Sequence, residues 1–264
     1  MAKLGIGKGH MARNMSTAAK RTIAVVIALI VVLVCAGAWY VSDYYRADAT
    51  ALAAVADEDG ASDGVVVQQL SDKAIAFVPD QPSAGFIFYP GAKVQPEAYA
   101  PLMTQLAERD ILCILVKPLF NLAILDVNIA DGLTAQFPDV ETWAIGGHSM
   151  GGVAASDYAA NHEGAFESVV FLASYPTADL TGFDGTTLSL AGTNDLVLNR
   201  TNYEKAGDLL PSASTSIDID GGNHAYFGNY GEQAGDGQAT ITREEQQSQA
   251  ADAIAALTSS ALKP

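Results

Sequence analysis

A serine set between glycines is the residue of this chain best suited to chemistry. Ser149 lies in Gly147-His148-Ser149-Met150-Gly151, which has the spacing G-x-S-x-G. Thr142–Gly147 before it has the composition of a buried strand, and Met150–His162 after it begins with an alanine-rich helical pattern. A sharp turn from strand to helix exposes a serine oxygen at the top of a sheet. The pattern predicts that Ser149 is a nucleophile, and the alternative is an ordinary glycine-rich turn.

The base that such a serine requires must be one of four histidines. A serine hydroxyl becomes nucleophilic when a neighbouring imidazole takes its proton. His10 lies in the basic N-terminal segment, His148 is fixed beside the serine, and His162 ends the following helix. His224 remains, just after the last predicted strand, and we predict that it is the general base. The alternative is a histidine of an ordinary surface loop.

An aspartate after another predicted strand is the candidate that orients this histidine. Asp195 follows the strand Thr187–Ala191 and precedes His224 in the chain. Asp218 and Asp220 are rivals, but they precede His224 too closely in sequence to orient its ring easily. The alternative role for Asp195 is to cap a helix N-terminus, a position that aspartate favours.

Backbone amides and aromatic side chains complete the predicted site. An oxyanion formed during acyl transfer needs two preorganised N–H donors. We assign them to Met150, directly after the serine, and to Ala92, in the loop after the third strand. We assign Phe120 and Tyr226 to substrate binding, with core packing as the alternative for these aromatic residues.

Short apolar runs alternate with helical patterns from residue 65 onward. The predicted strands are Val65–Leu70, Lys73–Val78, Gly85–Tyr89, Ile111–Lys117, Thr142–Gly147, Ser168–Ala173, Thr187–Ala191 and Thr215–Ile219. The predicted helices are Pro96–Arg109, Asn121–Gln136, Met150–His162, Asn202–Leu210 and Arg243–Leu262. Such alternation predicts an α/β fold with an eight-stranded, mostly parallel sheet flanked by helices. The first two strands have no helix between them, so we expect an antiparallel hairpin at one edge.

An uncharged segment near the N-terminus is long enough to cross a bilayer. Thr22–Val41 holds 20 residues without a charge, a helix of about 30 Å. All five basic residues of segment 1–21 precede it, which predicts a single-pass cell-membrane anchor with the domain outside the cytoplasm. One alternative is a cleaved signal peptide, with Ala36-Gly37-Ala38 as its cleavage site. A lipoprotein is disfavoured because Val34, which is not a small residue, precedes Cys35. The predicted organisation is a basic cytoplasmic segment 1–21, a transmembrane helix 22–41, a tether 42–64 and a domain 65–264.

Composition limits the partners of this domain. The 264-residue chain has a formal charge of −16, and the part after residue 21 carries −21. An acidic domain repels phosphate backbones, so we expect no nucleic-acid partner. Neither cysteine lies in a metal-ligand spacing, and no cluster of histidine and cysteine exists in the sequence. We therefore expect no metal and no cofactor.

Three motifs together resemble the α/β-hydrolase superfamily, in particular its compact branch of dienelactone hydrolases and small esterases. They are the serine motif at 147–151, Gly192-Thr193-Asn194-Asp195 and Gly222-Asn223-His224, and the resemblance covers about residues 65–262. It implies that Ser149 is the nucleophile, Asp195 the orienting acid and His224 the base. One departure is Pro90-Gly91, where many members have His-Gly. Many relatives insert a lid after the sixth strand, whereas only Ser174–Gly185 follows it here, so we expect an open site.

The expected function is hydrolysis of a carboxylic ester or related acyl substrate through an acyl-enzyme. The same triad could transfer an acyl group to an envelope component instead of water. A non-catalytic binding protein on a hydrolase scaffold is a further alternative, because a fold does not fix a function. Candidates for all three triad roles argue against that last alternative.

Overall fold

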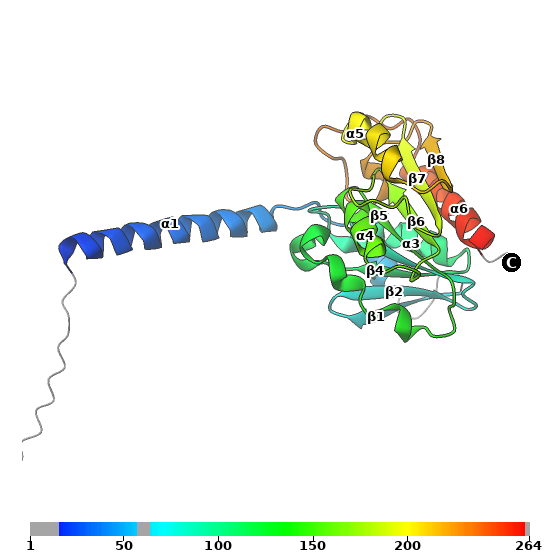
Figure 1. The fold of residues 1–264 in the computed structure, drawn as a ribbon, viewed down its shortest axis with the longest axis horizontal. Coiled ribbons are helices and arrows are strands. Elements are labelled where there is room, and N and C mark those ends of the chain that lie inside the picture. The colour runs from blue at the N-terminus through cyan, green and yellow to red at the C-terminus, as the bar shows by residue number, and fades with distance from the viewer. Residues whose placement is uncertain (1–15, 57–63, 262–264) are drawn as a thin grey trace, which may run out of the picture. The chain divides into compact units, whose positions relative to one another are not determined.

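The computed structural model describes residues 16–56 and 64–261, and the chain divides into two units after Asp43. The first unit contains one helix, α1 (Thr17–Ser42). The second unit contains an eight-stranded sheet with helices on both faces (Figure 1). Its strands are β1 (Val65–Ser71), β2 (Ala74–Pro79), β3 (Ala84–Tyr89), β4 (Ile111–Val116), β5 (Trp143–His148), β6 (Ser168–Leu172), β7 (Thr186–Gly192) and β8 (Ser214–Ile219).

The strands are arranged in the order β1-β2-β4-β3-β5-β6-β7-β8. β4, β3, β5, β6, β7 and β8 run parallel to one another, and β2 is antiparallel to both β1 and β4. The predicted α/β fold, its eight strands and the edge hairpin are therefore confirmed. Because the six parallel strands end at one edge, the loops that follow them meet there, and we call it the carboxyl edge.

Each face of the sheet is covered by its own layer. Helices α2 (Ala49–Ala56), α3 (Ala100–Ala107) and α6 (Arg243–Ala261) share one core with Phe86 and Phe88. Helix α4 (Met150–Ala160) shares the other core with Ile87 and Tyr89. Successive residues of β3 thus enter opposite cores, as a strand requires, and all four are fully buried. Burying each such side chain contributes about 1.5–3 kcal/mol.

One predicted helix, Asn121–Gln136, is wrong. The segment forms separate 3-10 turns, and i→i+3 hydrogen bonds such as Leu125 N–H to Leu122 O (3.0 Å) replace an α-helical ladder. Aspartate and asparagine compete with the backbone for hydrogen bonds, and Gly132 adopts a positive φ of 72°. The turns are Leu119–Asn121, Ala123–Leu125, Val127–Ala130 and Thr134–Gln136. The predicted helix Asn202–Leu210 is likewise shorter, with α5 at Arg200–Lys205 followed by a 3-10 turn at Ala206–Leu209.

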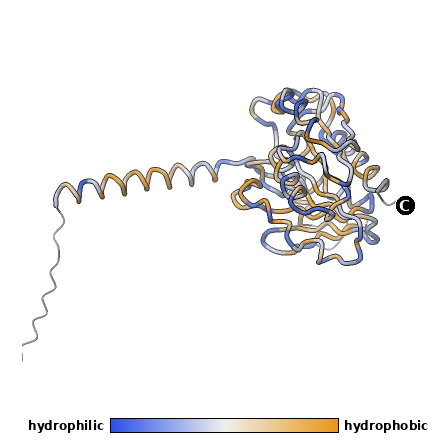
Figure 2. The backbone as a smooth tube through the Cα atoms, in the orientation of Figure 1, coloured by the Kyte–Doolittle hydropathy of each residue, from blue (hydrophilic) through white to orange (hydrophobic). Residues whose placement is uncertain are grey.

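Helix α1 is the one described helix that is long and apolar enough to cross a membrane by length and composition. It contains the predicted span Thr22–Val41 and is coloured as hydrophobic along most of its length (Figure 2). None of its side chains is buried. A signal sequence would have the same length and composition, so these properties leave the choice between anchor and leader open.

Part of the predicted tether 42–64 packs against the domain. Tyr45 forms a parallel bridge with Val94, and Asp48 N–H donates to Asn229 O at 2.9 Å. Ala51 of α2 is fully buried because this short helix presents a methyl face to α3. The compact unit Tyr44–Pro264 therefore includes part of the predicted tether, while residues 57–63 and most of the basic segment 1–21 lie outside the described residues.

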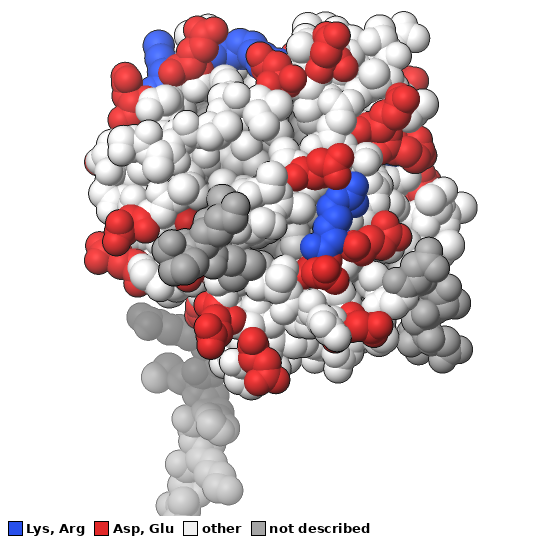
Figure 3. Space-filling view, turned by 90° about the vertical axis from the view of Figure 1, so that its right-hand side faces the viewer, with Lys and Arg blue, Asp and Glu red and all other residues white. Residues whose placement is uncertain are grey.

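The surface of the second unit is acidic. Figure 3 shows one face, on which Asp and Glu side chains lie scattered and Lys and Arg are few. This agrees with the formal charge of −21 that the chain carries after residue 21.

Candidate active site

The serine motif forms a strained turn between β5 and α4. Ser149 has φ 53° and ψ −124°, a conformation that non-glycine residues rarely adopt. Its N–H donates to Leu172 O at 2.9 Å, and Ser174 Oγ donates to Ser149 O at 2.6 Å. These bonds to β6 and to the loop after it hold the turn in place. Strain of this kind costs on the order of 1–3 kcal/mol and persists where surrounding structure enforces it.

The flanking glycines let the loop after β3 approach the serine turn closely, and the turn itself does not depend on a positive φ at either glycine. A Cβ on Gly147 would lie 2.5 Å from Tyr89 O, and one on Gly151 would overlap Tyr89 O and Pro90 O. The loop after β3 therefore packs directly on the elbow. The positive φ falls on Ser149, whereas neither Gly147 nor Gly151 has one.

His224 and Asp195 form a buried pair at the carboxyl edge. Nδ1 of His224 lies 2.9 Å from Oδ2 of Asp195. Oδ1 of Asp195 accepts hydrogen bonds from the amides of Val197 (2.9 Å) and Leu198 (2.8 Å). Asp195 is 3% exposed and His224 is 1% exposed, so little water competes for these bonds. The predicted pairing of acid and base is present in the geometry, and Asp218, one of the rivals, instead lies 3.5 Å from Arg200.

The loops that carry the pair are held against each other. A Cβ on Gly192 would overlap the backbone of Gly222, and Asn194 N–H donates to Gly222 O at 2.8 Å. The side chain of Gln246, from α6, accepts from Asn223 N–H (2.9 Å) and donates to Asn223 O (2.8 Å). Gln246 is fully buried and fixes the backbone beside His224. Sequence reasoning missed this residue because it lies in a helical pattern far from any motif.

The hydrogen bond to Asp195 determines which nitrogen of His224 can act as a base. A carboxylate only accepts, so Nδ1 carries the proton and Nε2 keeps its lone pair. Nε2 is buried and has no hydrogen-bond partner among the described residues. His224 and Ser149 line the same cleft of about 210 Å³. No hydrogen bond links the serine oxygen to Nε2 in the described part of the chain, and such bonds often tighten only when substrate is bound.

The walls of this cleft differ from the predicted ones. Besides Ser149, Met150 and His224, its lining residues are Val153, Ala173, Ser174, Tyr175, Val197, Leu198 and Asn199. Phe120 lines a different cleft, and Tyr226 packs beside the core with Arg243 4.6 Å from its ring centroid. Both assignments to substrate binding therefore lack support in the geometry. The positions of these lining residues in the chain could have identified them. Residues 173–175 and 197–199 follow β6 and β7, at the edge of the sheet where Ser149 lies.

The two predicted oxyanion donors are free to bind an anion. Met150 is the first residue of α4, where backbone amides have no partner within the helix. Ala92 is half-buried and follows Gly91, which packs on the elbow so closely that a Cβ there would lie 2.9 Å from His148 Nδ1. No described residue accepts a hydrogen bond from either amide.

A buried hydrogen-bonded chain connects the Gly91 loop to the histidine loop. Gly91 N–H donates to the Tyr99 hydroxyl (3.1 Å), which lies 2.8 Å from His148 Nδ1, and His148 Nε2 lies 3.1 Å from the carbonyl of His224. Because that carbonyl can only accept, His148 Nε2 carries the proton and Tyr99 donates to Nδ1. The histidine of the serine motif therefore positions its neighbours and is not a second base.

We expect Tyr99→Phe to lower the free energy of unfolding by about 1–3 kcal/mol, because the Gly91 amide and His148 Nδ1 lose their buried partner. Chemical denaturation measures the change. Tyr203→Phe is the matched control, since its hydroxyl pairs with Ser216 Oγ at 2.7 Å on an exposed part of the surface. Equal stability of the two variants would contradict the network.

His148 also makes stability depend on pH. Burial lowers the pKa of His148 well below its ordinary 6.5, and the neighbouring His224 ring adds to the effect. Below pH 6.5 this histidine binds a proton in the unfolded chain but stays neutral in the folded chain. Its contribution to the free energy of unfolding is therefore fully present above pH 6.5 and is lost as the pH falls. We expect a loss of up to about 1.4 kcal/mol per pH unit from this residue. Denaturation of wild type and His148→Gln between pH 7.5 and 5.5 measures it, and equal slopes would refute it.

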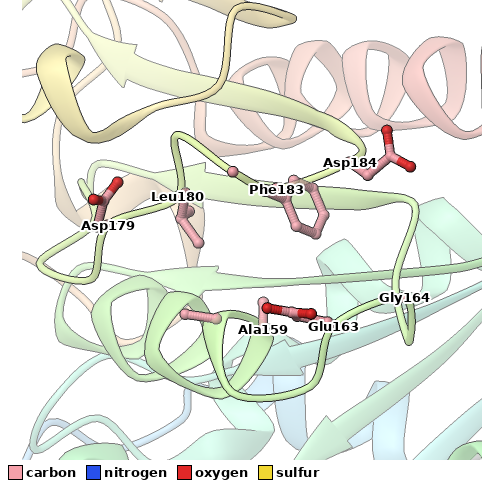
Figure 4. Close-up of a pocket in the computed structure, with 9 residues that line it drawn as sticks. Ala159, Glu163, Gly164, Asp179, Leu180, Phe183 and Asp184 are labelled. Carbon is pink, nitrogen blue, oxygen red and sulfur yellow. The ribbon is translucent and has the colours of Figure 1, made fainter.

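A second hollow lies apart from this chemistry. It is lined by Ala159, Ala160, Glu163, Gly164, Asp179, Leu180, Gly182, Phe183 and Asp184, several of which Figure 4 labels. It shares no residue with the cleft of Ser149. Its three carboxylates are not accompanied by a histidine or cysteine, and no metal-binding group is found among the described residues.

Comparisons with known proteins agree on the fold. A family model described as the α/β hydrolase family matches residues 85–248. A dienelactone hydrolase from Anabaena variabilis is 17% identical with a TM-score of 0.55, covering 75% of this chain and 97% of its own. A predicted CIB-like hydrolase from Thermoplasma acidophilum is 14% identical with a TM-score of 0.53, covering 74% and 100%. Est1E from Butyrivibrio proteoclasticus is 12% identical with a TM-score of 0.52, covering 75% and 100%. No curated protein matches the sequence.

Proposed function

Because the chain belongs to the α/β-hydrolase family, we propose that it is a serine hydrolase that cleaves a carboxylic ester or related acyl substrate. The observation that carries the proposal is the buried pair of Asp195 and His224, with an unpartnered Nε2 lining the same cleft as Ser149. A strained serine, a base with a free lone pair and two unpaired amides supply each part that acyl transfer needs.

In the proposed reaction Ser149 Oγ attacks the carbonyl carbon of the ester while its proton passes to His224 Nε2. The Met150 and Ala92 amides stabilise the oxyanion of the tetrahedral intermediate, and each is worth about 2.7–4 kcal/mol in comparable sites. The imidazolium then protonates the departing alcohol oxygen, which leaves an acyl-enzyme. Water, deprotonated by His224, attacks the carbonyl carbon of that ester. The bond to Ser149 Oγ then breaks, the imidazolium returns its proton to Oγ, and the acid leaves. Asp195 stabilises the transient positive charge on the ring through its 2.9 Å contact.

We also propose that α1 remains uncleaved and anchors the domain at the outer surface of the cell membrane. The support is its length of 26 residues, its apolar character and the five basic residues that precede its apolar part. A cleaved leader usually has an apolar core of about 7–15 residues, which is shorter than this one. Mass analysis of the mature protein tests the anchor, because a chain that starts after Ala38 would contradict it.

A fluorophosphonate probe tests the proposed chemistry. The purified full chain is expected to form one covalent adduct, on the peptide that contains Ser149. Labelling should depend on the native fold, since His224 activates the serine only when β5, β7 and β8 are assembled. A folded protein that forms no adduct would refute the proposal, as would an adduct on a different serine.

A further inference from the structure

The exposed apolar side chains of the domain gather at the carboxyl edge. Nine large apolar side chains of the described residues after Asp43 are exposed, and six of them follow the ends of β4, β5 and β7. These six are Leu119, Phe120, Ile124, Leu125, Met150 and Leu196. Met150 directly follows the nucleophile, and Leu196 directly follows the acid. Single exposed apolar residues are ordinary, but a group of them around one site is typical of a surface that binds a protein or a membrane.

The backbone at Phe120 favours the same conclusion. Phe120 and Asn121 have φ values of 57° and 55°, in the left-handed region that bulky residues avoid. Phe120 is nevertheless 51% exposed, so burial within the domain does not offset this strain. An apolar environment outside the domain would offset the strain by burying this exposed aromatic ring.

The first residue of the domain lies at this part of the edge. The cleft of about 540 Å³ that Phe120 and Leu125 line is also lined by Tyr44, the first residue of the domain. α1 ends at Ser42, so only Asp43 intervenes. Two residue steps span at most about 7 Å, whatever the angle of the helix. If α1 crosses a bilayer, this cleft lies at the bilayer surface.

The cleft that Phe120 and Leu125 line carries lysines beside its acids. Lys73 and Lys117 line it together with Asp72, Glu97 and Asp126, and they lie 3.9 Å from Asp126 and 2.8 Å from Glu97 respectively. Lys73 is 62% exposed, and a lysine stem can lie along an apolar surface while its ammonium group reaches lipid phosphates. Arg46 lies 4.6 Å from the ring of Tyr44, an aromatic and cationic pair typical of a membrane interface. The acidic domain can therefore approach an anionic bilayer here.

We propose that the carboxyl edge rests on the bilayer, with Leu119, Phe120, Ile124 and Leu125 in the interface. The cleft of Ser149 opens at the same edge, two strands from β4 in the sheet. Its substrate would then be an amphiphilic ester whose apolar part stays in the membrane and whose carbonyl reaches Ser149. This substrate class rests on the proposed serine hydrolase activity and on the anchor.

A spin-label experiment on the full chain in lipid nanodiscs tests the contact. Cys35→Ser removes the exposed thiol, and Cys113 is buried, so an introduced cysteine can be labelled selectively. Labels are placed at Leu125, at Val66 on the edge strand β1, and at Leu29 in α1. The expected result is that labels at 125 and 29 are accessible to oxygen and shielded from a water-soluble relaxation agent, with the label at 66 accessible to both. A water-exposed label at 125 with a shielded label at 29 overturns the contact but leaves the anchor, and exposure at both positions overturns both.

Hydrolysis separates this inference from the proposed activity. Leu119→Asp/Leu125→Asp should lose about tenfold in the rate on a long-chain ester held in phosphatidylglycerol vesicles and keep its rate on a soluble acetyl ester. Val66→Asp is the matched control, since Val66 is 45% exposed away from the carboxyl edge. Equal rates of the two variants on the vesicle-bound ester would overturn the membrane contact. It would also be overturned if the rate lost in Leu119→Asp/Leu125→Asp were restored by adding a protein partner in the absence of lipid. Failure of the wild type on both esters would instead refute the serine hydrolase.

Discussion

Ser149→Ala is expected to lower kcat for ester hydrolysis by on the order of a millionfold, leaving only the background rate of the oxyanion site. The reason is chemical, because alanine removes the proposed nucleophile, and Ser174, the other serine of the cleft, already donates its hydroxyl proton to Ser149 O. The variant should keep its fold, since Ser149 Oγ makes no hydrogen bond to another described residue. Steady-state kinetics and denaturation curves on the same preparation measure both effects.

Ser174→Ala is the control for this first prediction. Ser174 lines the same cleft and donates to Ser149 O, so its loss removes a hydroxyl and one hydrogen bond without touching the proton transfer. We expect a decrease of about tenfold or less. A Ser149→Ala enzyme that keeps even a hundredth of the wild-type rate would show that another nucleophile performs the reaction.

The second large effect is expected for Asp195→Asn, a loss of about ten thousandfold in kcat. The amides of Val197 and Leu198 both donate to Oδ1, so the carbonyl oxygen of an asparagine must take that place. The amide nitrogen then faces His224 Nδ1 and donates to it. This forces the proton of the neutral ring onto Nε2, the atom that must accept the proton of Ser149.

Asp218→Asn is the matched control for Asp195→Asn. Asp218 is the sequence rival, and its carboxylate is largely exposed beside Arg200. We expect this variant to retain the wild-type kcat and the wild-type dependence of kcat/KM on pH. A severe loss in Asp218→Asn with a mild one in Asp195→Asn would exchange the two assignments.

The sequence predicts most of the sheet and its reactive groups because both depend on local pattern. Ile111–Val116 is a continuous apolar run, as a strand buried on both faces must be, and it forms β4. Ser149, Asp195 and His224 follow strands that run parallel, so topology brings them to one edge. Their order in the chain is the pattern on which the prediction of these three residues depends.

The groups that position this chemistry were beyond sequence reasoning because their contacts join distant segments. Gln246 reaches Asn223 from a different element, and Tyr99 reaches His148 across 49 positions. Nothing in the local pattern distinguishes Tyr99 from other aromatic residues of the core. Aromatic type suggests Phe120 and Tyr226 as binding residues, but neither lines the cleft of Ser149, because the directions of the loops determine which side chains reach it. The helix expected at Asn121–Gln136 is absent for a local reason. The side chains of aspartate and asparagine compete for backbone hydrogen bonds, and this effect outweighs the helical spacing of the apolar residues.

The contact between Gly192 and Gly222 has a consequence for how this enzyme could be redesigned. A side chain at Gly192 would force the loops of Asp195 and His224 apart, and one at Gly222 would collide with the Gln246 side chain that fixes the histidine loop. Neither position can therefore accept a larger residue. The lining residue Tyr175 bears no such constraint, whereas Asn199 caps α5 by accepting from Asn202 N–H at 3.0 Å. A library that randomises Tyr175, keeps a capping residue at position 199 and spares the glycines should therefore yield many folded variants with altered selectivity. The residues that hold the two loops together are thus different from those that line the cleft, so the lining can change while the fold is kept.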